Sequence, residues 1–443
     1  MEFLEQLEIM SKEEIITLLE SERSKRIALE EECDLLAMEN HILRSENQKL
    51  KELGLIQSQQ KGTIDSVNND SKNNNDIKER DLYEELIEEG NECYVKDKYL
   101  EISNACSGMN VIAISFGNLN NNDNNIIICG GTDKKISIYT LLGEFIKSYI
   151  LTAPILCMDS LLPSPSLSSL IAVGLMDGKH IIIDIGLNNN ENSINIDNDN
   201  DDINKSNGIS IYNDHSKFVV GVRWNTDGKL LATCSRDFTV NLYKENEKKI
   251  YNKISTFRYA TVPESIIFIS NNNNNDNNND NDSKNECIEE LVIALRETCY
   301  LLYIDTCTMQ KRKVSMNVSA WDEHVSFNPL YLVTSPDRNF ITIATDKNNH
   351  ITLRTGTNRR LRSFSGHSCG DYGQPRLVFD STGKYLYCNS DGDSSILVYS
   401  VGQEKIVHRL KGHSGIVRGI ALDTTNKKIL ASCSHDGSVI LWK

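Results

Sequence analysis

The sequence predicts an all-β repeat domain preceded by an α-helical coiled coil. Short alternating apolar runs, each of strand length, follow one another from about Tyr94 to Lys443. Seven segments between about residues 104 and 442 share one order of strands and turns. Residues 1–54 differ, because leucines recur there at every seventh position. A two-residue period is typical of strands, and a sustained seven-residue period is typical of coiled coils.

The heptad pattern predicts how residues 1–54 associate. Leu29, Leu36, Leu43 and Leu50 take d positions, and Asn40 and Asn47 take a positions. Asparagine at a fixes the register and favours two parallel strands, and Glu39 at g would face Arg44 at e across the pair. We therefore expect a homodimer through this segment. Two alternatives stay open: a partner helix from another protein, or a single amphipathic helix packed on the repeat domain.

The next segments are polar. Residues 55–80 are rich in Gln, Ser, Asn and Asp, so we expect a disordered linker. Residues 81–93 indicate a short acidic helix. Three Asn/Asp-rich segments, near 118–125, 187–207 and 271–285, interrupt the β region. Because they hold few apolar groups, we expect them to be disordered surface loops.

The repeat is clearest at the C-terminus. Residues 412–442 hold a Gly-His pair, two apolar strands, a turn at Asp436-Gly437 and a third strand ending at Trp442. Residues 214–243 and 366–399 follow the same order, and weaker copies lie at 110–140, 154–184, 263–305 and 331–354. Cysteines recur shortly before the turns, at Cys129, Cys234, Cys388 and Cys433. Recurrence at one position of the repeat predicts small, buried packing residues.

These segments resemble WD repeats, whose signature is a Gly-His dipeptide, a tight turn with an aspartate and a terminal Trp-Asp pair. The resemblance implies a seven-bladed β-propeller, in which stacked blades bury each other's faces. It also implies a hydrogen-bonded tetrad within a blade. Its members in the last repeat would be His413, Asp436 and Trp442 with Ser432 or Ser434, and in the third repeat His215 and Asp237, with Tyr243 replacing tryptophan.

The last blade needs an outer strand from elsewhere in the chain. Only Lys443 follows Trp442, whereas the segment YVKDKYLEISNAC at 94–106 holds strand-forming residues such as Tyr99 and Ile102. We predict that this segment pairs with the strand ending at Trp442. The pairing would close the ring and remove an exposed sheet edge.

Composition restricts the classes of function. The net charge of −15 disfavours nucleic acid and anionic membranes as partners. No apolar stretch approaches the roughly 20 residues of a membrane span, and the acidic first residues predict no secretory leader. The 12 cysteines hold no CxxC pair, which argues against a zinc site and fits reduced thiols in the cytoplasm or nucleus. With no GxSxG, P-loop, HExxH or GxGxxG motif, neither catalysis nor a cofactor is expected.

Five residues are candidates for binding a partner: Arg223, Arg236, Arg376, Arg418 and His435. In WD-repeat proteins such positions lie on or near the narrow top face and the central channel. Arginines there can hold an acidic or phosphorylated peptide through bidentate contacts. The alternative is scattered surface charge and salt bridges between blades.

The resemblance implies a non-catalytic scaffold, in which the coiled coil sets valency and the propeller faces bind other proteins. Two alternative functions are a phosphoinositide-binding propeller of membrane traffic and a ubiquitin-ligase substrate adaptor. The first would carry an FRRG motif, but residues 358–362 (NRRLR) lack its Phe and Gly. The second would carry a WDxR ending, which is missing after every third strand.

Overall fold

The computed structural model describes residues 94–118, 125–161, 169–186, 193–196, 208–246, 250–271, 288–317, 327–347, 349–357, 359–369, 373–423 and 428–443. Every helix or strand assigned in these ranges is a β-strand. The predicted coiled coil (1–54), linker (55–80) and acidic helix (81–93) lie outside the described residues and stay predictions.

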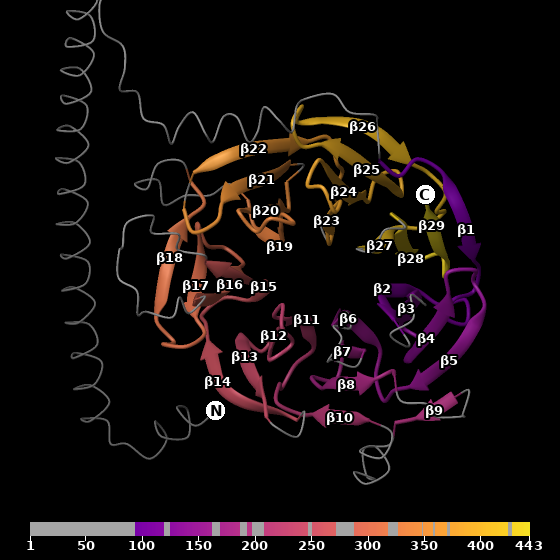
Figure 1. The fold of residues 1–443 in the computed structure, drawn as a ribbon, viewed down its shortest axis with the longest axis horizontal. Coiled ribbons are helices and arrows are strands. Elements are labelled where there is room, and N and C mark those ends of the chain that lie inside the picture. Colours follow the sequence, from indigo (N-terminus) through magenta and orange to yellow (C-terminus); the bar gives the residue numbers. More distant parts are fainter. Residues whose placement is uncertain are drawn as a thin grey trace, which may run out of the picture. The chain divides into compact units, whose positions relative to one another are not determined.

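The strands form seven sheets that surround a central channel as blades (Figure 1). This arrangement confirms the seven-bladed β-propeller predicted from the repeats. Within a blade, neighbouring strands are antiparallel except for the pair β5–β9 of blade 1, and the first strand of each repeat lines the channel. We number the blades by the repeats, from 1 (residues 110–140) to 7 (residues 412–442).

The order of strands within each blade runs from the channel outward. Blade 1 holds β2 (Val111–Asn118), β3 (Asn125–Gly131), β4 (Lys135–Thr140), β5 (Phe145–Ile150) and β9 (Ser193–Asn195). Blade 2 holds β6 (Ile155–Leu161), β7 (Leu170–Leu175), β8 (His180–Asp184) and β10 (Ile209–Tyr212). Blade 3 holds β11 (Val219–Trp224), β12 (Leu230–Ser235), β13 (Thr239–Glu245) and β14 (Tyr251–Arg258). Blade 4 holds β15 (Pro263–Asn271), β16 (Ile288–Leu295), β17 (Tyr300–Asp305) and β18 (Lys311–Ser315).

The remaining blades follow the same order. Blade 5 holds β19 (Pro329–Thr334), β20 (Phe340–Thr345), β21 (Asn349–Arg354) and β22 (Arg360–Ser365). Blade 6 holds β23 (Leu377–Phe379), β24 (Tyr385–Ser390), β25 (Ser395–Ser400) and β26 (Lys405–Leu410). Blade 7 holds β27 (Val417–Leu422), β28 (Leu430–Ser434), β29 (Val439–Trp442) and β1 (Lys98–Ile102).

The core lies between the blades. Middle strands such as β7 (LIAVGL) and β12 (LLATCS) are buried along their whole length, because both faces of a blade are covered. Seven apolar clusters result, each shared by two neighbouring blades. The recurrent cysteines are fully buried in them, at Cys129, Cys234, Cys388 and Cys433. Each blade therefore depends on both of its neighbours for a complete hydrophobic interface.

The two ends of the propeller share one sheet. Strand β1 pairs antiparallel with β29, with Lys98 opposite Trp442 and Ile102 opposite Val439. The ladder continues past the strands, since the Lys443 amide donates to the Asp97 carbonyl at 2.9 Å. The predicted closure by residues 94–106 is therefore confirmed, and blade 7 is completed by chain from the start of the domain.

One prediction about the Asn-rich segments is wrong. Within 187–207, which was expected to be disordered, residues Ser193–Asn195 form β9 and pair parallel with the outer strand β5. Ile194 and Ile196 are buried in the core cluster between blades 1 and 2. The prediction rested on the Asn/Asp-rich composition of the whole segment. It overlooked the short alternation Ser-Ile-Asn-Ile, which places both isoleucines on one face of a strand.

Removing the closing strand should destabilise the propeller. A chain beginning at Gly108 loses β1 and the buried side chains of Val95 and Ile102. Burying two such side chains contributes about 3–6 kcal/mol, so we expect aggregation or a strongly lowered melting temperature. A chain beginning at Asp81 keeps β1 and should melt like the full-length protein. Equal melting of the two truncated chains would contradict the closing role of β1.

Candidate protein-binding site

The turn between β28 and β29 is held by a hydrogen-bonded tetrad in blade 7. The indole N–H of Trp442 donates to the Ser432 hydroxyl at 2.8 Å. That hydroxyl also lies 2.8 Å from Nε2 of His413, whose Nδ1 lies 3.1 Å from the Asp436 carboxylate. The carboxylate also accepts the Ser414 amide at 2.9 Å. These hydrogen bonds connect the loop before β27 to the turn between β28 and β29.

Blade 3 has a modified version of the same network. Nδ1 of His215 lies 3.2 Å from the Asp237 carboxylate, and its Nε2 lies 2.8 Å from the Thr233 hydroxyl. Tyr243 replaces the tryptophan and donates to Asp214 at 3.0 Å. Because phenol and indole reach different acceptors, the tyrosine anchors the loop before β11 directly.

Ser432 and Ser434 have different roles. Ser432 lies between His413 and Trp442, whereas the Ser434 hydroxyl accepts the backbone amide of Asp436 at 3.2 Å within the turn. Burial alone would raise the pKa of Asp436, but hydrogen bonds from Ser438 and the Ser414 amide hold it well below its ordinary value. The turn aspartate therefore stays ionised and keeps its acceptor role.

We call the face of the ring that carries the turns with Asp237 and Asp436 the top face. Arg236 precedes Asp237 there and forms a bidentate ion pair with Glu264 of blade 4, at 3.0 and 3.1 Å. Arg296 binds the same carboxylate at 2.6 Å. The side chain of Glu264 is only 7% exposed, so its charge is compensated by these two arginines. The geometry of Arg236 is that of a salt bridge between blades.

A second pair lies on the top face of blade 7. Nε of Arg418 donates to Nε2 of His435 at 3.0 Å. Burial and the nearby Arg418 charge both lower the pKa of His435 below its ordinary value, so the neutral ring that accepts this bond is favoured. Arg418 and His435, both predicted binding residues, therefore contact each other.

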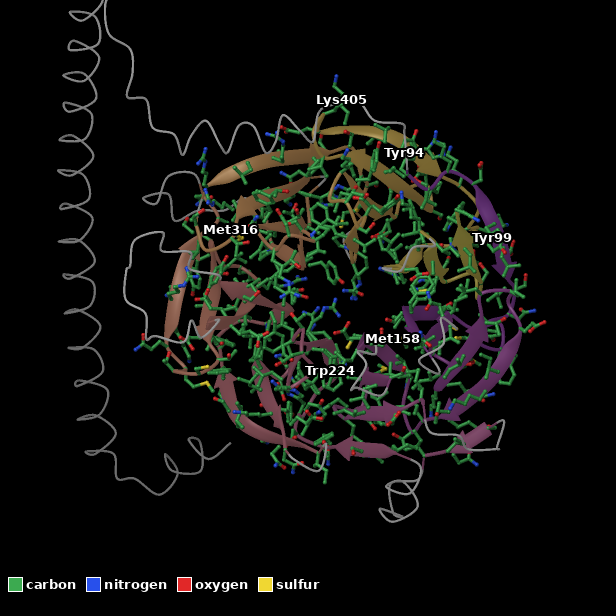
Figure 2. All side chains as sticks on the ribbon, viewed as in Figure 1. Tyr94, Tyr99, Met158, Trp224, Met316 and Lys405 are labelled. Atoms are coloured by element: carbon green, nitrogen blue, oxygen red, sulfur yellow. The ribbon has the colours of Figure 1, made fainter. Side chains whose placement is uncertain are left out.

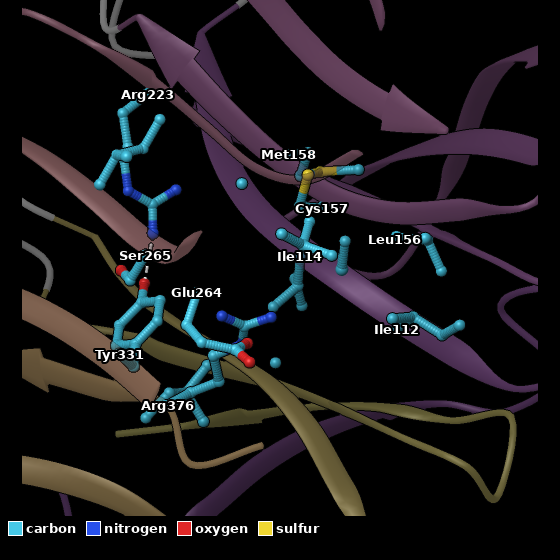
Figure 3. Close-up of a pocket in the computed structure, with 16 residues that line it drawn as sticks. Ile112, Ile114, Leu156, Cys157, Met158, Arg223, Glu264, Ser265, Tyr331 and Arg376 are labelled. Carbon is cyan, nitrogen blue, oxygen red and sulfur yellow. Dashed lines mark hydrogen bonds between the residues drawn. The ribbon is translucent and has the colours of Figure 1, made fainter. Parts of the chain in front are cut away.

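The channel holds the remaining two arginines around one tyrosine (Figure 3). Its cavity of about 50 Å³ is lined by the inner strands, and Tyr331 of β19 reaches into it. Arg223 donates to the Tyr331 hydroxyl, and the guanidinium carbon of Arg376 lies 4.8 Å from the centre of the same ring. Asp159 is 3.9 Å from Arg223. Among the described residues, no carboxylate is within ion-pair distance of Arg376.

The sequence of two blades matches a known family of β-propeller repeats. The family described as "WD domain, G-beta repeat" matches residues 207–244 and 404–443, which cover the repeats of blades 3 and 7. These are the blades with the hydrogen-bonded turns described above. The chain is a WD-repeat β-propeller.

Curated relatives match over one short stretch of this WD-repeat protein. WD repeat-containing protein 75 of Xenopus laevis is 49% identical over 78 residues, which are 18% of this chain and 9% of that protein. Its Homo sapiens counterpart is 46% identical over 67 residues, covering 15% and 8%. A chromatin assembly factor 1 subunit of Mus musculus is 35% identical over 63 residues, covering 14% and 11%. The matched part thus spans about a tenth of each relative.

Two residues of the WD-repeat channel were missed in the sequence. Tyr331 occupies the position after the bulge of the first strand, where other blades carry small residues: Ala113, Cys157, Gly221, Ser265 and Gly419. One aromatic residue in a column of small ones was the available signal. Glu264 offered no such signal, because its two arginine partners come from different turns.

The described part of the propeller offers no metal centre or membrane helix. No group of three or more His, Cys, Asp or Glu side chains in these residues could hold a metal ion. Helices long and apolar enough to cross a membrane are likewise absent from this part of the chain. In the channel, burial raises the pKa of Cys157 to about 12, so the thiol stays protonated.

Three buried histidines interrupt the apolar interfaces between blades. His350 and His367 stack with ring centres 4.0 Å apart across blades 5 and 6, and His180 stacks on Tyr212 at 4.7 Å. None of their ring nitrogens has a hydrogen-bond partner among the described residues. Burial lowers the pKa of His180 to about 3 and that of His367 to about 4, and holds the pKa of His350 well below 6.5. All three are neutral in the folded protein.

Substituting alanine for Ser432 should cost more stability than the same change at Ser434. The first change leaves the buried Trp442 N–H and His413 Nε2 without their partner, which should cost about 2–4 kcal/mol. The second removes one acceptor within a turn and should cost about 1 kcal/mol. Urea unfolding followed by tryptophan fluorescence measures both. Equal losses would argue against Ser432 as the tetrad member.

The histidine stacks should make the propeller less stable in mild acid. The unfolded chain binds protons at these histidines near pH 6.5, whereas His180 and His367 stay neutral in the folded chain until about pH 4, so stability falls as pH falls through this window. Each of these two histidines contributes about 1.4 kcal/mol per pH unit. His367→Leu should reduce the slope of unfolding free energy against pH, between pH 5 and 6, by that amount. Parallel curves for the two proteins would contradict the prediction.

Proposed function

We propose that this WD-repeat propeller is a non-catalytic scaffold that binds acidic or phosphorylated segments of other proteins at its channel. WD-repeat propellers are typical protein-interaction scaffolds and are generally non-catalytic. The observation that supports the channel is the pairing of Arg223 and Arg376 around Tyr331 without a carboxylate against Arg376. Two guanidinium groups against one tyrosine ring repel each other, and an anion in the adjoining cavity would relieve that repulsion.

The size of the cavity limits what can enter. About 50 Å³ accommodates a few water molecules, or one carboxylate or phosphate group in their place. A peptide would therefore lie on the top face and insert one acidic side chain. Arginine suits this role, because its planar donors match both anions and stay charged at any physiological pH.

Assembly is the second part of the proposal. A parallel dimer through residues 1–54 would hold two propellers on one stalk and raise avidity for a partner with two binding segments. One relative is by name a subunit of a chromatin assembly factor, which supports a role within a larger complex. The cysteines of the described residues are all free, which supports a reducing compartment, the cytoplasm or the nucleus.

Replacing Arg376 should weaken peptide binding without unfolding the protein. Arg376→Gln removes one charge from the channel, and the loss of a charge-assisted bidentate contact should raise Kd about tenfold or more. Full-length protein is titrated with glutamate-rich and phosphoserine peptides by fluorescence anisotropy. Arg312→Gln is the matched control, because it should lower stability by breaking the bidentate pair with Glu290 on the outer strand β18, away from the channel, while leaving Kd unchanged. Equal affinity of wild type and Arg376→Gln would reject the channel as the binding site.

The dimer is tested separately from the channel. Sedimentation equilibrium on the peptide 1–54 should give twice the monomer mass at tens of micromolar. Asn40→Leu should raise the melting temperature and allow other oligomers, because the polar a position no longer restricts the pairing. A monomer at these concentrations would remove the dimer from the proposal and leave the channel untouched.

A further inference from the structure

Charge is distributed very unevenly along this chain. The whole chain has a net charge of −15. Residues 1–93 carry 24 acidic and 11 basic side chains, and residues 94–443 carry 38 acidic and 36 basic ones. The propeller segment is therefore nearly neutral as a whole, and the chain in front of it is strongly acidic.

Exposed positive charge gathers on the outer strands of blades 4, 5 and 6. Strands β18 (KRKVS), β22 (RLRSFS) and β26 (KIVHRL) contain no acidic residue. Three of the basic residues here have ion pairs: Arg312 with Glu290, Arg362 with Glu404 and Arg409 with Asp393. Five exposed residues remain outside these pairs, and we call them the basic belt: Lys311, Lys313, Arg360, Lys405 and Lys411.

The described chain begins beside this belt. Tyr94 packs against Tyr385 and His408 of blade 6, with ring centres 5.0 and 5.8 Å apart. The Lys96 carbonyl lies 3.2 Å from Nε2 of His408, a residue of β26. Figure 2 shows Lys405 pointing away from the ring at the outer edge of the same blade. Whatever precedes Tyr94 must therefore leave the propeller next to the basic residues of β26.

The preceding segment has the opposite charge. Residues 81–92, DLYEELIEEGNE, contain six Asp and Glu and no Lys or Arg. Fully extended, 12 residues span at most about 40 Å, so these carboxylates stay near the blade from which the chain emerges. Tethering gives them an effective concentration in the millimolar range or above, which a separate polyanion must exceed to compete.

We propose that residues 81–92 dock on the basic belt and cover it. The docked segment shields the propeller from polyanions outside the chain. A flat membrane would reach only part of a convex rim, whereas a polypeptide follows the curvature. A nucleic acid would have to displace the tethered carboxylates. The contact is electrostatic and exposed, so it weakens as salt shortens the Debye length from about 8 Å at 0.15 M to 3 Å at 1 M.

Zero-length carbodiimide crosslinking of the full chain, read by mass spectrometry, tests the contact. Carboxylates of residues 81–92 should join to Lys405 and Lys411 at low salt, and these crosslinks should fall at least fivefold in 1 M NaCl. The exposed Lys229 and Lys428, outside the belt, serve as reference lysines. The proposal is overturned when the segment joins the reference lysines as often as the belt, or joins neither.

A charge-neutralised full-length protein tests the shielding. E84Q/E85Q/E88Q/E89Q should elute from heparin at a higher salt concentration than wild type, because the belt is uncovered. The matched control E13Q/E20Q/E31Q/D34N changes the net charge equally, at predicted outer positions of the coiled coil, and should elute like wild type. Equal shifts of both variants would mean that total charge alone decides retention. Wild-type protein that already binds single-stranded DNA or phosphatidylserine vesicles as tightly as E84Q/E85Q/E88Q/E89Q would show that the belt is open to another class of polyanion.

Discussion

Every blade of this propeller buries its two faces against its two neighbours, so the ring is complete only when the first and last repeats meet. The pairing of β1 with β29 makes that junction, and the core cluster around Ile102, Val111 and Val439 forms behind it. Repeats of similar sequence build the other six interfaces from neighbours along the chain. The seventh joins residues more than 300 positions apart, at the entropic expense of closing the longest loop in the domain.

This constraint explains where polar groups are tolerated. Between the blades, some buried polar groups belong to hydrogen-bonded networks, as around Ser432 and His413. The rings of His180, His350 and His367 have no hydrogen-bond partner among the described residues and stay neutral. On the top face, the buried Glu264 is compensated by Arg236 and Arg296. The channel differs, because Arg223 and Arg376 share one tyrosine, Asp159 lies 3.9 Å from Arg223 only, and the carboxylate of Glu264, which also lines the cavity, is already bound by Arg236 and Arg296. A ligand binds most favourably where it neutralises a charge that the protein leaves uncompensated.

Parts of the site were accessible to sequence reasoning and parts were not. The tetrad residues recur at fixed spacing, so His413, Asp436 and Trp442 could be identified within one repeat. The choice between Ser432 and Ser434 needed the structure, because residues two apart on a strand share one face, and only the position along β28, with Ser432 opposite Ile440, separates them. The arginines were predicted as one group, yet they lie in three places. Arg223, Arg236 and Arg376 have partners from other blades, whereas Arg418 pairs with His435 of its own blade. Pairing across blades leaves no trace in the spacing of a single repeat.

The sequence by itself determined the number of repeats, the strand pattern of each blade and the need for a closing strand before the first repeat. These follow from short-range periodicity, which decides which faces must be buried. Only the tertiary structure decided that Ile194 and Ile196 of an Asn-rich segment add a fifth strand to blade 1. It also decided that Tyr331 reaches into the channel between two arginines, and that the outer strands of three blades carry one basic belt. The physical reason is the same in each case: these features join residues from different repeats, and their distances are set by the curvature of the closed ring.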